Sequence, residues 1–150
     1  DSIESTLLNF TGLEHRLEWV RNLNGVDYIN DSKGTNVGSV YKSLNTFDRP
    51  IILIVGGKDK NTDFFPLKNL VKEKVKYLVL IGETRKKFKA ILNDSLGYEE
   101  SDSLEEAVVM AKAKAQEGDI ILLSPACSSF DMFKDYADRG TRFKAIVKNL

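Results

Sequence analysis

Hydrophobic residues in this chain form short unbroken runs, separated by segments in which they recur every three or four positions. The unbroken runs are rich in isoleucine, leucine and valine, which is typical of strands buried on both faces of a sheet. These predicted strands are 51–55, 77–81 and 119–123. The segments with helical spacing predict helices at 36–45, 66–74, 85–92 and 104–116, and a closing helix within 131–150. The alternation of strand and helix predicts a mainly parallel sheet covered by helices on both faces.

A hairpin is predicted near the start of the chain. Asn24-Gly25 lies between the alternating segments 17–21 and 26–30, and Asn-Gly in that position is the strongest short hairpin signal. A minor strand is predicted around Tyr98. The predicted fold is therefore a single α/β, Rossmann-like, three-layer domain over residues 1–150. Its six-stranded, mainly parallel sheet has an antiparallel edge hairpin and helices on both faces.

Composition narrows the class of protein. The 150 residues are 42% hydrophobic and carry no net charge, which fits one globular domain and gives no bulk attraction to nucleic acid or anionic membranes. The single Cys127 excludes an internal disulfide and is expected to be a packed thiol. No apolar run approaches the roughly 20 residues of a membrane span. The start at Asp1 suggests a processed or excised piece, in which residues 1–10 are the end of a preceding segment.

Three loops are expected to meet at the carboxyl edge of the sheet, where open α/β sheets bind ligands. In the loop 31–36, Asp31, Lys33 and Thr35 place an acid, an ammonium and a hydroxyl at the start of a helix, which attracts anions. A simple helix cap by Thr35 or Asn36 explains the same segment equally well. Candidate ligand chemistry at this place therefore depends on the other two loops.

The second and third loops are 56–63 and 124–130. Gly56 and Gly57 allow close backbone approach to a ligand, and Lys60 offers a cation for a carboxylate or phosphate. A turn with a solvated lysine is the alternative for this loop. Ser128 and Ser129 could likewise only cap the closing helix near Asp131. All three loops combine small residues with hydroxyls or charge.

Other candidates are excluded or weak. The chain contains neither the glycine-rich dinucleotide fingerprint nor the phosphate-binding P-loop motif. His15 has no metal-ligand companion, Trp19 is expected to pack, and the basic cluster at 85–89 is expected to be an exposed helix face. The residues alone therefore indicate an α/β domain that binds an anion or an amino acid.

At the same loops the sequence resembles a known family. The segments that carry the resemblance are 15–18 (HRLE), 30–36 (NDSKGTN), 56–64 (GGKDKNTDF) and 123–133 (LSPACSSFDMF), with Arg139, Gly140 and Phe143 beyond them. In this order and spacing they resemble the C-terminal domain of the Mur ligases, in particular the bacterial UDP-N-acetylmuramoyl-L-alanine:D-glutamate ligases. The sister Mur ligases and the folylpolyglutamate synthases share the fold but carry different residues in the second and last segments.

The resemblance implies the third domain of a three-domain cytoplasmic enzyme of peptidoglycan synthesis. In that family ATP phosphorylates the terminal carboxylate of UDP-N-acetylmuramoyl-L-alanine, and the amine of D-glutamate attacks the acyl phosphate. ATP and Mg²⁺ are bound mainly by a central domain, so the isolated third domain is expected to be inactive. A monomer is expected, because no broad apolar stripe is left unassigned in the sequence.

The resemblance also implies roles for individual residues. Arg16 and Asp31 correspond to nucleotide contacts, with the acid on the ribose hydroxyls and the guanidinium nearer the phosphates. Lys33 corresponds to a catalytic lysine near the phosphoryl group and the incoming substrate, where a cation offsets developing charge. The residues that correspond to the D-glutamate site are Thr35, Lys60, Ser129, Phe130 and Tyr136. No metal ligand is expected in this chain.

The chain departs from the family pattern at three positions in or near these segments. Gly34 stands where alanine is common, Phe130 where leucine occurs and Tyr136 where phenylalanine occurs. Lys58 competes with Lys60 for the carboxylate role, and the spacing to Asp63 favours Lys60. The alternative to an enzyme domain is a flavodoxin-like module that binds a nucleotide or an acidic metabolite without catalysis.

Overall fold

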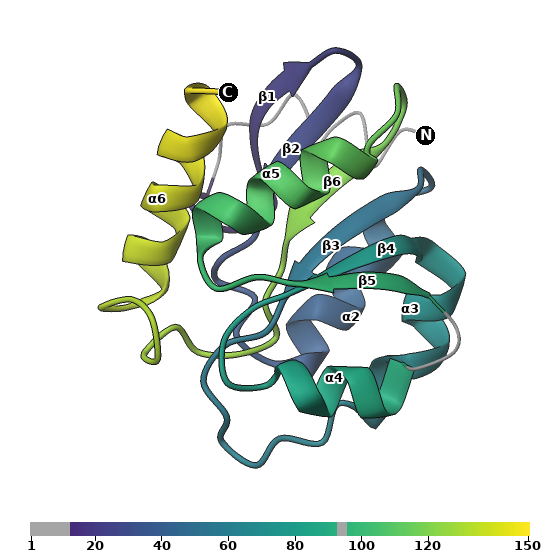
Figure 1. Cartoon of the computed structure of the whole chain (residues 1–150), viewed down its shortest axis with the longest axis vertical. Coiled ribbons are helices and arrows are strands. Elements are labelled where there is room, and N and C mark those ends of the chain that lie inside the picture. Colours follow the sequence, from purple (N-terminus) through teal and green to yellow (C-terminus); the bar gives the residue numbers. More distant parts are fainter. Residues whose placement is uncertain (1–12, 93–95) are drawn as a thin grey trace.

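The computed structural model describes residues 13–92 and 96–150, so the predicted role of residues 1–10 lies outside the described residues. Its centre is a six-stranded sheet with the strand order β1-β2-β6-β3-β4-β5 (Figure 1). The strands are β1 (Glu18–Leu23), β2 (Val26–Asn30), β3 (Ile51–Val55), β4 (Val75–Leu80), β5 (Gly97–Glu100) and β6 (Ile120–Leu123). β1 pairs antiparallel with β2, and the other neighbouring pairs are parallel. The predicted sheet and its edge hairpin are confirmed.

The hairpin turn follows from its sequence. Asn24 and Gly25 both have positive φ angles, 55° and 81°, as the tight primed turns that join twisted strands require. Leu23 pairs with Val26 across the turn. β1 therefore continues to Leu23, two residues beyond the predicted end of the strand.

The helices are α2 (Val37–Thr46), α3 (Lys68–Lys74) with a preceding 3₁₀ turn (Phe65–Leu67), α4 (Arg85–Leu92), α5 (Leu104–Lys114) and α6 (Tyr136–Lys148). All the predicted helices are present. α5 ends two residues earlier than predicted, because Ala115 has an extended backbone and Gln116 N–H donates to the side chain of Asp119 at 2.8 Å. α6 begins only at Tyr136, so residues 131–135 belong to the loop that precedes it.

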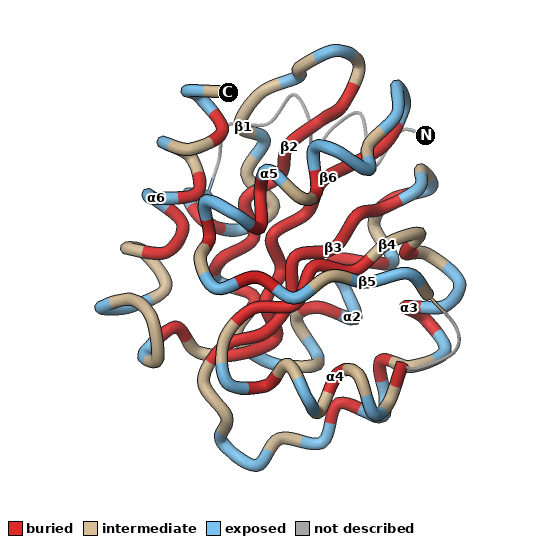
Figure 2. The backbone as a smooth tube through the Cα atoms, viewed as in Figure 1, coloured by how far each residue is buried: buried red, intermediate tan, exposed pale blue. Residues whose placement is uncertain are grey.

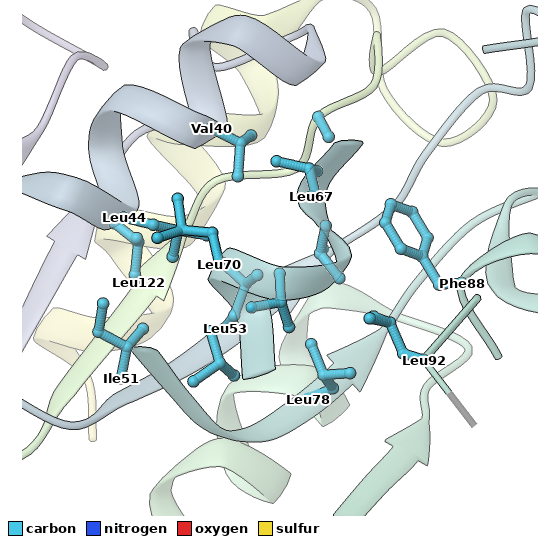
Figure 3. Packing of buried hydrophobic residues seen from close by; sticks show 14 of the residues in the cluster. Val40, Leu44, Ile51, Leu53, Leu67, Leu70, Leu78, Phe88, Leu92 and Leu122 are labelled. Atoms are coloured by element: carbon cyan, nitrogen blue, oxygen red, sulfur yellow. The ribbon is translucent and has the colours of Figure 1, made fainter. Parts of the chain in front are cut away.

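Two hydrophobic layers enclose the sheet. The central strands β2, β3 and β6 are buried along their length, whereas the edge strands β1 and β5 are partly exposed and the helices bury only one side (Figure 2). Alternate residues of β3 point to opposite faces, so that Leu53 packs with α2, α3 and α4 (Figure 3) and Ile54 packs with α5 and α6. This alternation explains why the buried strands read as unbroken apolar runs.

The carboxyl end of β6 is a topological switch point. β6 lies between β2 and β3, from which the chain passes to α2 and α3 on one face of the sheet. From β6 the chain passes to α6 on the opposite face (Figure 1). Loops that leave neighbouring strands in opposite directions open a crevice at this edge, where ligands of open α/β sheets bind. The three loops singled out in the sequence follow β2, β3 and β6.

Candidate functional site

The three loops are hydrogen-bonded to one another. Ala126 N–H donates to Gly34 O at 2.8 Å, which joins the loop after β6 to the loop after β2. Gly56 N–H donates to Pro125 O at 2.9 Å and Lys58 N–H to Ser128 O at 3.0 Å, which join it to the loop after β3. The loop 124–130 therefore lies between the other two, and all three form one continuous rim.

Arg139 of α6 is hydrogen-bonded to two of the loops that form this rim. Its side chain is buried, with Nε donating to Ser32 Oγ at 2.8 Å and its terminal nitrogens to Ser32 O at 2.7 Å and Cys127 O at 3.1 Å. Burial lowers the pKa of the guanidinium to about 10, so that it stays charged at neutral pH. The sequence interpretation gave Arg139 no such role. Its position on the buried side of α6, with Phe143 and Val147 at four-residue intervals, is the signal that could have identified it.

Asp31 is buried at the start of the loop after β2. Its Oδ1 accepts from Leu17 N–H at 3.1 Å, and its Oδ2 accepts from Ser43 Oγ at 2.6 Å and Ser124 Oγ at 2.7 Å. Burial raises the pKa of this carboxyl, although these hydrogen bonds and the charge of Arg16 oppose the rise. The carboxylate therefore stabilises the fold of the loop, whatever ligand it also contacts.

A cavity of about 290 Å³ opens beside Asp31. The side chains of Arg16, Lys33 and Lys42 bring three cations to it, and α2 adds three hydroxyls. The full lining is Arg16, Leu17, Asp31, Lys33, Gly34, Ser39, Lys42, Ser43 and Thr46. Three cations around one buried carboxylate leave a net positive lining, which favours an anionic ligand.

The candidate residues for D-glutamate lie along the rim. The ammonium of Lys60 is 5.7 Å from the ring centroid of Phe130, whose side chain is 61% exposed. The ammonium of Lys33 is 5.7 Å from the ring centroid of Tyr136, at the start of α6. Lys33 therefore lines the cavity beside Asp31 and also lies near the start of α6. Thr35 is half-buried in the loop after β2, which is one of the three loops joined by hydrogen bonds.

Helix capping explains only some of the polar residues in the loops after β2 and β6. Asn36 caps α2, because its side chain accepts from Ser39 N–H at 2.9 Å, which leaves the Thr35 hydroxyl outside the cap. Asp135 caps α6, which excludes the alternative in which Ser128 and Ser129 only cap this helix. In the described part of the chain, the buried side-chain oxygens or nitrogens without a hydrogen-bond partner are Ser128 Oγ, Ser129 Oγ and Asp131 Oδ1. All three belong to the loop after β6.

The two competing lysines of the loop after β3 differ in their partners. Lys58 lies 3.4 Å from the carboxylate of Glu83, and nearby Lys87 lies 2.8 Å from Asp59. Lys60 has no carboxylate partner among residues 13–92 and 96–150. The geometry thus leaves Lys60, rather than Lys58, available to an anionic ligand.

His15 and Cys127 are both buried and structural. His15 Nδ1 lies 2.9 Å from Asn30 Nδ2, and His15 O accepts from Lys33 N–H at 2.9 Å. Cys127 packs below the rim, and burial raises the pKa of its thiol to about 11. Trp19 donates its indole N–H to Asp27 at 2.9 Å, but it is 40% exposed and belongs to neither hydrophobic cluster, so the predicted packing role is not confirmed.

The basic helix α4 is neutralised by neighbouring acids. Arg85 pairs with Asp102 at 3.0 Å and Lys89 with Glu100 at 3.1 Å. Across the described ranges, no three histidine, cysteine, aspartate or glutamate side chains are placed to hold a metal ion. No helix in the same ranges is long and apolar enough to cross a membrane.

Comparisons with known proteins agree with this geometry. Residues 15–127 match the family described as Mur ligase, glutamate ligase domain. The UDP-N-acetylmuramoylalanine–D-glutamate ligase of Geotalea daltonii is 53% identical over 142 residues, which are 95% of this chain and 31% of the relative. That of Aquifex aeolicus is 46% identical over 149 residues, which are 99% of this chain and 36% of the relative. The chain thus spans about a third of the length of these relatives.

Solved structures show the same fold at low identity. The bifunctional folylpolyglutamate synthase/dihydrofolate synthase of Yersinia pestis has a TM-score of 0.65 at 14% identity, covering 93% of this chain and 32% of that chain. The UDP-N-acetylmuramate-alanine ligase of Thermotoga maritima has a TM-score of 0.62 at 12% identity, covering 93% of this chain and 31% of that chain. Because the family match covers most of the chain and its relatives are about half identical, the chain belongs to the Mur ligase family, as a glutamate ligase domain.

Proposed function

We propose that this chain is the C-terminal domain of a longer, cytoplasmic ligase that adds D-glutamate to UDP-N-acetylmuramoyl-L-alanine in peptidoglycan synthesis. Two observations support this proposal. The relatives that are about half identical carry that name, and the chain spans about a third of their length. The sister ligases, at 12–14% identity, share only the fold. The binding of UDP and most of the binding of ATP and Mg²⁺ fall to residues outside these 150.

The single observation that carries the D-glutamate assignment is the buried hydroxyl of Ser129, which has no partner in the described chain. Native proteins leave few buried polar groups without a hydrogen bond, so such a group needs an explanation. A carboxylate oxygen would accept from Ser129 Oγ, from the ammonium of Lys60 and from the hydroxyl of Thr35. A dicarboxylate therefore supplies the acceptors that these residues lack.

The pocket side chains Phe130 and Tyr136 lie beside the two cations. Each ring centroid is 5.7 Å from an ammonium, Lys60 for Phe130 and Lys33 for Tyr136. An aromatic face attracts a cation at such a distance, which favours this position of each lysine side chain. Phe130 and Tyr136 thus orient the cations toward the amino acid, and they replace leucine and phenylalanine without removing apolar surface.

The cavity beside Asp31 is proposed to hold the ribose and phosphates of the nucleotide. Asp31 already accepts three hydrogen bonds, which leaves room for about one more, because a carboxylate has about four lone-pair sites. Arg16 and Lys33 supply positive charge at the same cavity. Lys33 is proposed as the catalytic cation, which stabilises the negative charge that develops as the amine of D-glutamate attacks the acyl phosphate.

Kinetics of the full-length ligase test the D-glutamate site. Replacement of Lys60 or Ser129 by alanine is expected to raise KM for D-glutamate and to leave KM for ATP nearly unchanged. A hydrogen bond to a charged group contributes about 1.5–3 kcal/mol, which corresponds to a KM change of about 10- to 150-fold. Lys112→Ala, which removes an exposed cation of α5 beside the β1–β2 turn, is the matched control. Unchanged KM and turnover in both site variants would refute the assignment.

A binding-only module makes a different prediction. It would bind a nucleotide or an acidic metabolite tightly with these 150 residues alone. The ligase domain is expected to bind weakly in isolation, because half of the cleft is missing and the cost of immobilising the ligand is not recovered. An NMR titration of the chain with D-glutamate, L-glutamate and ADP separates the two. Submillimolar affinity for any of them would favour the binding-only module.

A further inference from the structure

The loop 56–63 carries Lys60, and the turn between β4 and α4 holds that loop in place. Thr84 Oγ1 accepts from Gly57 N–H at 3.1 Å, and Glu83 Oε1 accepts from Asp59 N–H at 3.0 Å. Lys87, in the first turn of α4, lies 2.8 Å from Asp59 Oδ1. Contacts from one neighbouring segment therefore fix the backbone on the N-terminal side of Lys60.

The backbone on the other side of Lys60 is fixed by the same aspartate. Asn61 N–H donates to Asp59 Oδ1 at 2.9 Å, and Asn61 has a positive φ of 60°. Asparagine adopts this left-handed conformation more readily than most residues, so a tight turn forms here. Lys60 therefore lies at the tip of a turn in which Asp59 binds the Asn61 amide, and Asp59 is itself bound by Glu83 and Lys87.

Glu83 makes more contacts to this loop than any other residue of the β4–α4 turn. Its carboxylate lies 3.4 Å from Lys58 Nζ and accepts from Asp59 N–H, while its own N–H donates to Asp131 Oδ2 at 3.1 Å. The Asp59 amide is the largest cause of a lowered pKa at Glu83, and Lys58 adds to it. Glu83 thus connects the loop after β3 with the loop after β6, which carries Ser129.

The ion pair also separates the roles of the two lysines. Lys58 and Lys60 are two positions apart in one short loop, and either cation could approach a dicarboxylate. Glu83 neutralises Lys58 and leaves Lys60 without a carboxylate partner among the described residues. An exposed ion pair contributes little free energy by itself, so its effect on geometry depends on the accompanying backbone hydrogen bond.

We propose that Glu83 is a positioning residue for Lys60: it holds Lys58 and the Asp59 amide, and so fixes the turn that presents Lys60 to the amino-acid substrate. This inference rests on the proposed role of Lys60 in binding D-glutamate. Glu83 does not touch the substrate, so its loss alters where Lys60 lies and leaves the chemical groups of the site in place.

Steady-state kinetics of the full-length ligase test the proposal. Glu83→Ala is expected to raise KM for D-glutamate roughly 3- to 10-fold, with kcat and KM for ATP within about twofold of wild type, since a small displacement of a binding group weakens binding without removing it. Glu83→Gln is expected to give a smaller rise, because its amide oxygen still accepts from Asp59 N–H. Lys58→Ala is expected to change KM for D-glutamate by less than about twofold, since Lys58 is paired away from the site.

Asp102→Asn is the matched control, because it breaks the ion pair with Arg85 close to the same turn without touching the loop of Lys60. The proposal is overturned if Glu83→Ala leaves KM for D-glutamate unchanged, lowers only kcat, or has the same effect as Asp102→Asn. Lys60→Ala separates this inference from the proposed function. If Lys60→Ala raises KM and Glu83→Ala does not, only the positioning role fails; if Lys60→Ala has no effect, the D-glutamate site itself fails.

Discussion

The α-carbon of Gly34 lies so close to the carboxylate of Asp31 that a β-carbon on residue 34 would be 2.8 Å from Asp31 Oδ2. The same β-carbon would be 2.9 Å from Ser124 Oγ and 3.0 Å from Asp31 O. These distances explain why glycine fits at position 34. The hydroxyls of Ser43 and Ser124 fix the carboxylate against the Gly34 backbone, and no space is left for a methyl group.

Gly34→Ala is therefore expected to destabilise the chain. Overpacking of a buried site typically costs about 1–3 kcal/mol, because neighbouring groups must move. Urea unfolding of the variant measures the change. Gly38→Ala is the matched control, since the nearest contact of its new β-carbon is 3.5 Å away and alanine favours the helix by up to about 1 kcal/mol. Equal stability of Gly34→Ala and wild type would contradict the packing described for Asp31.

Replacement of Arg139 by methionine is expected to loosen the rim as well as to destabilise the fold. It removes three donors, and each buried acceptor left without a partner costs about 1–3 kcal/mol. Arg139→Lys is expected to be intermediate, because lysine keeps the charge but lacks the planar set of donors. The amide of Ala126, which joins two of the loops, should exchange its hydrogen faster in both variants.

Arg142→Met provides the comparison for Arg139. Arg142 is exposed and pairs with Asp138 at 3.3 Å within the same helix, so its loss is expected to cost less than about 0.5 kcal/mol. If Arg142→Met and Arg139→Met have similar effects on unfolding and on exchange at Ala126, Arg139 does not support the loops in the way its hydrogen bonds indicate.

Much of the fold could be predicted because its signals are local. The apolar runs of β3 and β6 and the Asn24-Gly25 turn each specify one element without reference to the rest of the chain. The start of α6 could not be predicted in this way. Ser128, Ser129 and Asp135 are all acceptable caps in sequence, and the choice depends on the turn that Ser129 O forms with Met132 and Phe133 N–H.

A candidate site could be proposed from the sequence where one residue brings its own chemistry, as for Lys60, whose role stays a prediction. It was not predictable where the role arises from contacts between distant segments. His15 Nδ1 would be 2.1 Å from a β-carbon on Gly140, so this glycine is required by the packing of a histidine 125 positions earlier. Arg139, which bonds to Ser32 and Cys127, depends on tertiary structure in the same way.

Cys127 is expected to resist alkylation in the folded chain. Burial raises the pKa of its thiol to about 11, so almost none is thiolate at pH 8, and the thiolate is the reactive species. In urea the same thiol should react at the rate of a free cysteine. Because the unfolded thiol loses its proton near its ordinary pKa of 9 and the folded one only near 11, the free energy of unfolding should fall between these values as pH rises. A fast reaction without urea at pH 8 would contradict this burial.

Ser43→Ala is expected to destabilise the chain most when Asp31 is charged. Ser43 Oγ donates to Asp31 Oδ2 at 2.6 Å, and a hydrogen bond to a charged group contributes about 1.5–3 kcal/mol. Burial already raises the pKa of Asp31, and loss of this donor raises it further. The folded variant therefore binds a proton at higher pH than wild type, so acidification should narrow the difference in unfolding free energy between them.

Urea unfolding of wild type and Ser43→Ala from pH 7 to pH 4 measures that difference. Ser39→Ala is the control, because Ser39 lies on the same helix and lines the same cavity but has no hydrogen bond to Asp31. Its effect should be small and independent of pH. A constant difference for Ser43→Ala across this range would mean that the Ser43 hydroxyl does not stabilise the charged form of Asp31, and the buried carboxylate would then depend on Ser124 and the Leu17 amide alone.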